Sequence, residues 1–177
     1  TGSAKGEKFA SQLRFKMSKD AEVRAVSDLL LAAEKRMEKR FDPVLAAAVL
    51  QNNHNHSHWD EIAVKCLSCA NCTLVCPTCF CSTTEDITDI TGNHTERWVR
   101  WDSCFNGDFT YIHGGHIRHS TRSRYRQWLT HKLSHWYDQF GSSGCVGCGR
   151  CATWCPVGID LIEELAVIQS QEMAMAD

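Results

Sequence analysis

Apolar residues recur at helical spacing in two long segments of the chain. In residues 120–140 they fall on one stripe: Tyr125, Trp128, Leu129, Leu133, Trp136 and Phe140. Spacings of three and four residues place such side chains on one face of a helix. Ser120 or Thr121 is suited to cap the first turn, and Gly141 to end the last one. The pattern predicts a helix over residues 120–140 whose stripe faces a core.

A second amphipathic helix is expected to begin at Ser18 and to end at the pair Asp42-Pro43. Its inward positions are Val23, Val26, Leu30, Ala33, Met37 and Phe41. Charges of the sign that the helix dipole favours lie near its two ends: Asp20, Glu22, Lys39 and Arg40. Because proline lacks the N–H that a helix interior needs, the helix stops there.

Two shorter helices complete the helical pattern. Asp42-Pro43 suits the N-cap and first position of a helix over residues 43–50. Asp160 and Glu163 form a D-x-x-E cap for a helix that runs to about Met175. We therefore expect a mainly α fold.

Strand patterns are weak by comparison. No stretch shows sustained alternation of apolar and polar residues, and residues 82–93 are polar and predict a loop. Trp98, Val99 and Trp101 suggest a short strand or turn.

Composition places the chain among ordinary globular proteins, with 177 residues, 43% apolar and 23% charged content. The net charge of −2 gives no reason to expect nucleic acid as a partner. No apolar run approaches the ~20 residues of a membrane span, and residues 1–4 lack the features of an export signal. We expect a cytoplasmic protein with no direct membrane span. The chain has no dinucleotide-binding glycine motif, P-loop or nucleophile elbow, so no catalytic residue is predicted.

Eleven cysteines are the unusual feature, and the odd number argues against a framework built wholly of disulfides. Eight of them form two copies of the pattern C-x2-C-x2-C-x3-C-P, which is typical of proteins with two iron-sulfur clusters. The first run is Cys66, Cys69, Cys72 and Cys76, and the second is Cys145, Cys148, Cys151 and Cys155. In each run the first three thiolates can hold one cube, and the fourth points toward the other cube. The predicted cofactors are two [4Fe-4S] clusters, with Cys155 completing the first site and Cys76 the second.

Zinc is the alternative, because C-x2-C pairs also build tetrahedral four-thiolate sites. Zinc sites commonly use two pairs that are a dozen or more residues apart. Two consecutive x2 gaps followed by C-x3-C-P, present twice, favour clusters over zinc.

The 68 residues between Cys76 and Cys145 are far more than a compact bacterial ferredoxin has between its runs. This insert must have structure of its own. We expect an α-helical ferredoxin in residues 59–177, preceded by a helical segment in residues 1–58.

Further motifs resemble the iron-sulfur (beta) subunit of soluble bidirectional [NiFe] hydrogenases, or sulfhydrogenases, and the related iron-sulfur subunit of anaerobic sulfite reductase. They are residues 66–81 (CLSCANCTLVCPTCFC), 101–104 (WDSC), 114–116 (GGH), 131–132 (HK) and 144–151 (GCVGCGRC). The resemblance covers about residues 59–165, and C-P-T-C-x-C and W-D-S-C are absent from ordinary ferredoxins. Members of this 4Fe-4S dicluster family are longer at the N-terminus, so the resemblance implies that residues 1–58 are the tail of a missing N-terminal domain.

The resemblance implies an electron relay. A flavin subunit exchanges hydride with NAD(P)H, this subunit passes single electrons, and a hydrogenase or sulfite reductase catalytic subunit uses them. The chain would then be a non-catalytic subunit of an oxidoreductase complex. A different class remains open, that of a stand-alone structural or sensor protein, although a sensor normally needs one labile cluster and an output domain.

Three cysteines lie outside the two runs: Cys79, Cys81 and Cys104. The simpler interpretation makes them small buried residues beside the cluster loops. The alternative is a third metal site completed by His94, His113, His116 or a residue from outside the chain. C-x-C alone is a weak signal.

The remaining polar groups have structural and functional interpretations. His54, His56 and His58 alternate in a polar stretch that is more typical of a solvated loop than of a metal site. We expect the basic residues from Arg118 to Arg126 to contact the acidic clusters or a partner subunit, and a plain solvated helix face is the alternative. Together with Trp98 and Trp101 they are candidates for a surface that contacts a partner subunit. Trp154, inside the second run, is expected to shield a cluster from water.

Overall fold

The computed structural model describes residues 1–176, and the chain forms two compact units, residues 1–40 and a larger unit that begins at Phe41. The first unit contains α1 (Ala4–Ala10) and α2 (Asp20–Arg36). The backbone N–H of Lys19 donates to the Glu22 carboxylate (2.7 Å), which fixes the first turn of α2. The predicted domain boundary at residues 58/59 stays a prediction.

The prediction for α2 is only partly confirmed. The helix exists, but it begins at Asp20, two residues beyond the expected start at Ser18, and ends at Arg36, before Lys39, Arg40 and Phe41. Its stripe is not turned inward, because the large apolar side chains of this face are exposed: Val23, Val26, Leu30 and Met37. Periodicity defines an apolar face but does not supply the surface that would cover it.

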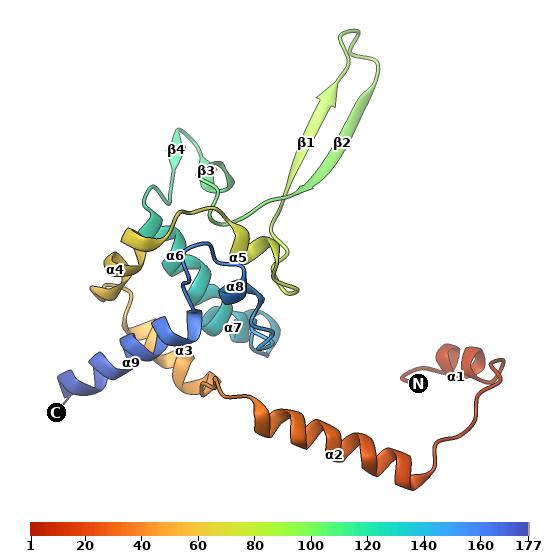
Figure 1. Ribbon diagram of the computed structural model, residues 1–177. Coiled ribbons are helices and arrows are strands. Elements are labelled where there is room, and N and C mark those ends of the chain that lie inside the picture. Colours follow the sequence, from red (N-terminus) through yellow and green to blue (C-terminus); the bar gives the residue numbers. More distant parts are fainter. Residues whose placement is uncertain (177) are drawn as a thin grey trace. The chain divides into compact units, whose positions relative to one another are not determined.

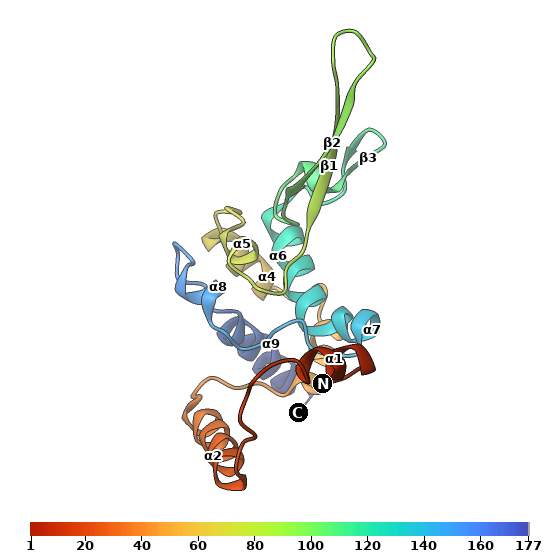
Figure 2. The same ribbon diagram turned by 90° about the vertical axis from the view of Figure 1, so that its right-hand side faces the viewer.

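The larger unit is a helical body from which a long hairpin projects (Figures 1 and 2). Its α-helices are α3 (Pro43–Asn52), α4 (His58–Lys65), α5 (Asn71–Leu74), α6 (Thr121–Thr130), α7 (Trp136–Phe140), α8 (Arg150–Thr153) and α9 (Leu161–Ala176). The π-helical segment η2 (His131–His135) joins α6 to α7, and the 3-10 turn η1 (Asp108–Thr110) precedes a small hairpin. The predicted helical core is confirmed.

The core lies where α3, α4, α6, η2 and α9 pack against one another. Its buried apolar side chains are Ala46, Val49, Leu50, Trp59, Ile62, Phe105, Tyr125, Trp128, Leu129, Leu133, Ile159, Leu161, Leu165 and Ile168. Cysteines of both runs pack at the edge of this cluster. The core therefore supports the loops that carry the thiols.

The predicted caps of α3 and α9 are confirmed. The Asp42 carboxylate accepts the N–H groups of Val44 (2.8 Å) and Leu45 (3.0 Å), and Pro43 occupies the first turn. At α9 the Asp160 carboxylate accepts the N–H of Ile162 (2.9 Å). Each bond satisfies an N–H that would have no partner inside the helix.

The helix predicted over residues 120–140 is present, with Ser120 as its N-cap and Gly141 in the left-handed conformation (φ 70°) at its end. Most of its stripe is buried as expected, but Phe140 is half-exposed. The helix is also interrupted by the π-helical turn η2. Such a turn changes the direction of the side chains that follow it, which periodicity alone does not indicate.

The loop predicted for residues 82–93 is wrong over residues 82–88, because β1 (Ser82–Thr88) pairs in antiparallel register with β2 (Thr95–Trp101). Residues 89–93 lie in the turn between the two strands, as predicted. The strand expected around Trp98 is confirmed, and Trp98 and Trp101 are exposed. Both faces of this hairpin are solvated, so its sequence lacks the alternation that marks a half-buried strand. The second hairpin pairs β3 (Tyr111–Ile112) with β4 (Gly115–His116). In the described part of the chain, no helix is long and apolar enough to cross a membrane.

Candidate functional site

The two cysteine runs have the same backbone conformation. Two residues after the first cysteine, Ser68 (φ 51°) and Gly147 (φ 68°) are left-handed, and Ala70 (φ 64°) and Gly149 (φ 70°) are left-handed two residues later. A one-turn helix then follows in each case, α5 or α8. Side chains other than glycine rarely adopt this conformation, so Ser68 and Ala70 hold a strained shape that the second run achieves with glycine.

This conformation directs backbone N–H groups at sulfur. The N–H of Ser68 donates to Cys66 Sγ (3.4 Å), and the N–H of Gly147 donates to Cys145 Sγ (3.5 Å). Hydrogen bonds from backbone amides to sulfur orient cluster ligands and stabilise their negative charge. The repeat seen in the spacing is thus a repeat in structure.

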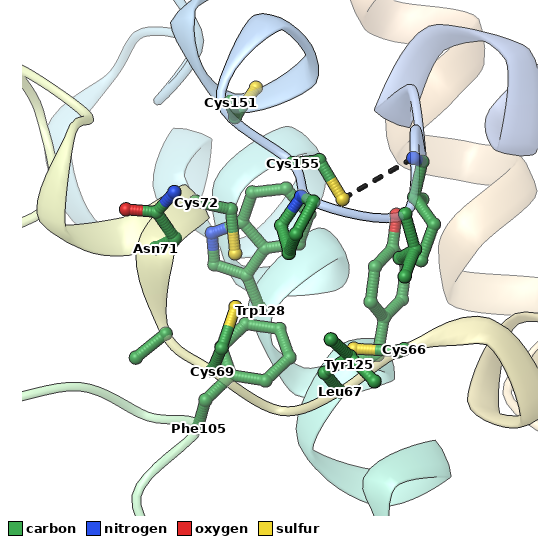
Figure 3. Close-up of a pocket in the computed structure, with 14 residues that line it drawn as sticks. Cys66, Leu67, Cys69, Asn71, Cys72, Phe105, Tyr125, Trp128, Cys151 and Cys155 are labelled. Atoms are coloured by element: carbon green, nitrogen blue, oxygen red, sulfur yellow. Dashed lines mark hydrogen bonds between the residues drawn. The ribbon is translucent and has the colours of Figure 1, made fainter.

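A cavity beside the first run contains thiols from both runs (Figure 3). Cys66, Cys69 and Cys72 line it together with Cys151 and Cys155, which reach the same space from the second run. The other walls are largely apolar, with Phe105, Tyr125, Trp128 and Ile159 among the lining residues. The N–H of Ile159 donates to Cys155 Sγ (3.3 Å). Thiols that are about 80 residues apart in the sequence therefore line one cavity.

Two thiols of the first run, Cys66 and Cys72, lie where a negative charge is unfavourable without a cation. Burial raises the pKa of Cys72, and the neighbouring Cys66 and Cys151 raise it further. Burial also raises the pKa of Cys66, against a smaller opposing effect of the Ser68 N–H. A bound metal centre supplies the positive charge that makes such thiolates stable.

Two polar atoms at the cavity support the same interpretation. Within the described part of the chain, Trp128 Nε1 and Tyr125 Oη are buried without a hydrogen-bond partner, and both residues line the cavity. Buried donors are normally satisfied. A cluster carries sulfide acceptors, so the donors, the thiols and the apolar walls together fit a [4Fe-4S] group.

Cys76 is tied to the start of the second run. Thr78, two residues after Cys76, donates from Oγ1 to the carbonyl of Gly144 (2.6 Å), the residue before Cys145. Lys132 connects the same groups, because its Nζ lies 3.2 Å from Cys76 Sγ and 3.1 Å from the Gly144 carbonyl. The fourth thiol of the first run thus lies beside the second run.

Electrostatics agree with this grouping. Burial and then the nearby Cys145 raise the pKa of Cys151 to about 11, and Cys76 and Cys148 add to the effect. Hydrogen bonds from Cys79 and Thr78 lower the pKa of Cys76 to about 4 despite its partial burial. Cys76 therefore favours the anionic form and lies close enough to Cys151 to raise the pKa of that thiol.

A hydrogen bond joins the two loops directly. Asn71 Nδ2 in α5 donates to the backbone carbonyl of Trp154 (2.6 Å), which lies 83 positions later. Trp154 is 62% exposed and does not line this cavity, and its predicted role in shielding a cluster stays a prediction. Phe105, Tyr125 and Trp128 line the cavity. Trp128 and Tyr125 were recognisable from the helical stripe, whereas Phe105 had no signal in the sequence.

The three remaining cysteines lie next to other thiols. The Cys79 thiol forms a hydrogen bond to Cys76, and a hydrogen bond from the Cys104 thiol lowers the pKa of Cys81 to about 6. All three are half-buried, and all eleven cysteines are free thiols. Among residues 1–176, no three His, Cys, Asp or Glu side chains are close enough to hold a single metal ion. Among the proposed partners, His94 bonds to Glu96 in the hairpin and His116 to the Gly107 carbonyl.

The histidine prediction was partly wrong. His54 is exposed, but His58 begins α4 with only 3% of its surface exposed. Its ring bonds to Glu61 (2.8 Å) and to Glu164 of α9 (2.5 Å). His58 therefore joins two helices instead of lying in a solvated loop, and its partner 106 residues away had no local signal.

The arginines in α6 form most of their ion pairs and hydrogen bonds with other residues of the larger unit. Arg122 pairs with Asp60 (2.9 Å), and Arg126 donates to the His54 carbonyl (2.7 Å). Arg124 donates to the carbonyls of Arg118 (3.1 Å) and His119 (3.0 Å). These three arginines hold neighbouring segments in place, so they are poor candidates for a free partner surface.

Comparison with known proteins agrees with the site. Residues 65–159 match the 4Fe-4S dicluster domain. The chain is 32% identical over 167 residues to sulfhydrogenase 2 subunit beta of Pyrococcus furiosus, an alignment that covers 93% of this chain and 49% of the relative. It thus spans about half the length of that relative. No solved structure matches. By its matched residues and its paired cysteine loops, the chain belongs to the 4Fe-4S dicluster domain family.

Proposed function

We propose that this chain holds two [4Fe-4S] clusters with exchanged fourth ligands and relays electrons between a flavin/NAD(P)H subunit and the catalytic subunit of a [NiFe] hydrogenase. Cys66, Cys69, Cys72 and Cys155 hold the first cluster. Cys145, Cys148, Cys151 and Cys76 hold the second. The cavity that Cys155 shares with the first run is the observation that carries the proposal.

The bound clusters would supply one-electron redox centres. The residues around them orient the thiolates and limit access of water. Amide donors at Ser68, Gly147 and Ile159 stabilise the ligand sulfurs, and the Asn71–Trp154 bond holds the two loops side by side. Because each run would donate a ligand to the other site, the two centres would be neighbours, which is what fast transfer between them requires.

The proposed partners rest on the relative. Its name describes a beta subunit of a sulfhydrogenase, which favours a hydrogenase complex over a sulfite reductase complex. A sensor or purely structural role receives no support from a specific feature of the described residues.

Single substitutions of the cysteines test whether each run donates its fourth ligand to the other cluster. The anaerobically loaded protein should contain about eight iron and eight sulfide per chain. Cys155→Ala should remove or alter the same centre as Cys69→Ala, although Cys69 lies in the other run, and should leave the signature that Cys151→Ala destroys. Electron paramagnetic resonance of the reduced variants measures this. Cys104→Ala is the matched control and should keep eight iron.

If Cys155→Ala instead altered the same centre as Cys151→Ala, each run would be a closed four-ligand site and the proposal would be wrong. About twelve iron in the unchanged protein, reduced by Cys104→Ala, would indicate a third cluster. Stoichiometric zinc without sulfide would end the electron-transfer proposal.

The relay itself is tested in a reconstituted complex. NAD(P)H-driven hydrogen production should be lost with Cys155→Ala, whereas hydrogen production driven by a reduced viologen dye at the catalytic subunit should persist. Equal loss of both activities would point to failed assembly, and retention of both would exclude a relay through this chain.

A further inference from the structure

Lys132 is a buried cation at the second site. It is 3% exposed, and its Nζ contacts three acceptors: Cys76 Sγ (3.2 Å), Thr78 Oγ1 (2.9 Å) and the Gly144 carbonyl (3.1 Å). An ammonium has three N–H donors, so its capacity is filled. One of those donors points at a thiol that the proposed function assigns to a cluster.

The local fold holds this lysine in place. Lys132 lies in the π-helical segment η2, and its ammonium is 5.5 Å from the centre of the Trp136 ring. The Gly144 N–H donates to the Lys132 carbonyl (3.0 Å), so lysine and loop are joined at both backbone and side chain. A side chain fixed in this way is a permanent feature of the site, unlike a mobile surface lysine.

Among residues 1–176, no charged side chain donates a hydrogen bond to a sulfur of the first site. Its cation is Arg124, whose guanidinium donates to two carbonyls and lies 3.4 Å from Ser68 Oγ. The donors to its sulfurs are the neutral amides of Ser68 and Ile159. Hydrogen bonds from a charged donor are roughly twice as strong as neutral ones. The two sites therefore differ in one respect: only the second has a buried charged donor, Lys132, in contact with a cysteine sulfur among the described residues.

The physical consequence concerns the reduction potential. Adding an electron increases the negative charge of a site, and a cation in a poorly screened interior stabilises the reduced form more than the oxidised form. Hydrogen bonds to cluster sulfurs and local charge are known controls of such potentials. Building on the proposed function, we infer that Lys132 is a positioning residue that raises the reduction potential of the second centre through Cys76.

Potentiometric titration of neutral variants tests this inference. In the loaded chain, Lys132→Met and Lys132→Gln should lower the equilibrium constant for one-electron reduction of the second centre at least tenfold, a drop of about 59 mV or more. The first centre should change less than threefold. Lys65→Met is the matched control, because Lys65 directly precedes the first run but is exposed, and it should change either constant less than twofold.

The glutamine variant is included because its amide can still donate to a neighbouring oxygen. A change of less than threefold at the second centre in a variant with both centres would overturn the inference. Loss of the second centre from both variants would also overturn it, since Lys132 would then be structural. Failure of the proposed function is distinguishable, because the unchanged chain would lack eight iron or two reducible centres.

Discussion

Gly144 packs more closely against its surroundings than any side chain would allow. A Cβ placed there would lie 2.7 Å from the Lys132 carbonyl oxygen and 2.6 Å from the Trp136 ring. The carbonyl is backbone within a helical segment, so it cannot move aside as a flexible side chain does. Gly144→Ala should therefore push the loop before Cys145 away from η2.

The expected cost follows from two effects. Overpacking a close contact destabilises a protein by about 1–3 kcal/mol. Movement of the loop also weakens the bonds between Gly144 and Lys132 (3.0 and 3.1 Å), and a bond from a charged donor contributes about 1.5–3 kcal/mol. The sum is about 2.5–6 kcal/mol, which lowers the melting temperature of a chain this long by about 5–24 °C.

Thermal melts of the iron-loaded protein at one fixed heating rate measure the effect. Gly115→Ala is the control, since nothing lies within 4 Å of its Cβ position and its φ is not left-handed. The control should melt within about 2 °C of the unchanged protein. A Gly144→Ala variant that melts with the control would refute the close approach of the loop to η2.

Two further predictions concern the helical body and the hairpin. His58→Ala leaves the buried Glu164 carboxylate without its partner and should lower the free energy of unfolding, measured with a chemical denaturant, by about 3–5 kcal/mol. Glu61→Ala removes the exposed partner of the same ring and should lower it by less than about 1 kcal/mol. Equal losses in the two variants would contradict a buried His58–Glu164 pair. Replacement of residues 84–99 by Asn-Gly should leave iron content unchanged and stability within about 0.5 kcal/mol, because β1 and β2 bury almost no surface; loss of iron would show that the hairpin supports the cysteine loops.

Much of the local structure followed from short-range rules. The caps at Asp42, Ser120 and Asp160 were predictable because each involves an oxygen and N–H groups two or three residues away. The hairpin over residues 82–101 was missed because solvent covers both of its faces, and without burial there is no alternation to detect.

By itself, the sequence determined the two repeated cysteine loops and the helices that carry the core, since turn chemistry and apolar periodicity act within a few residues. Only the tertiary structure decided which groups distant in sequence meet. Cys155 reaches the first cavity, Lys132 contacts Cys76 across 56 positions, and His58 meets Glu164 across 106. Such contacts depend on how helices pack, and packing is set by the sum of many weak apolar contacts and not by any local pattern.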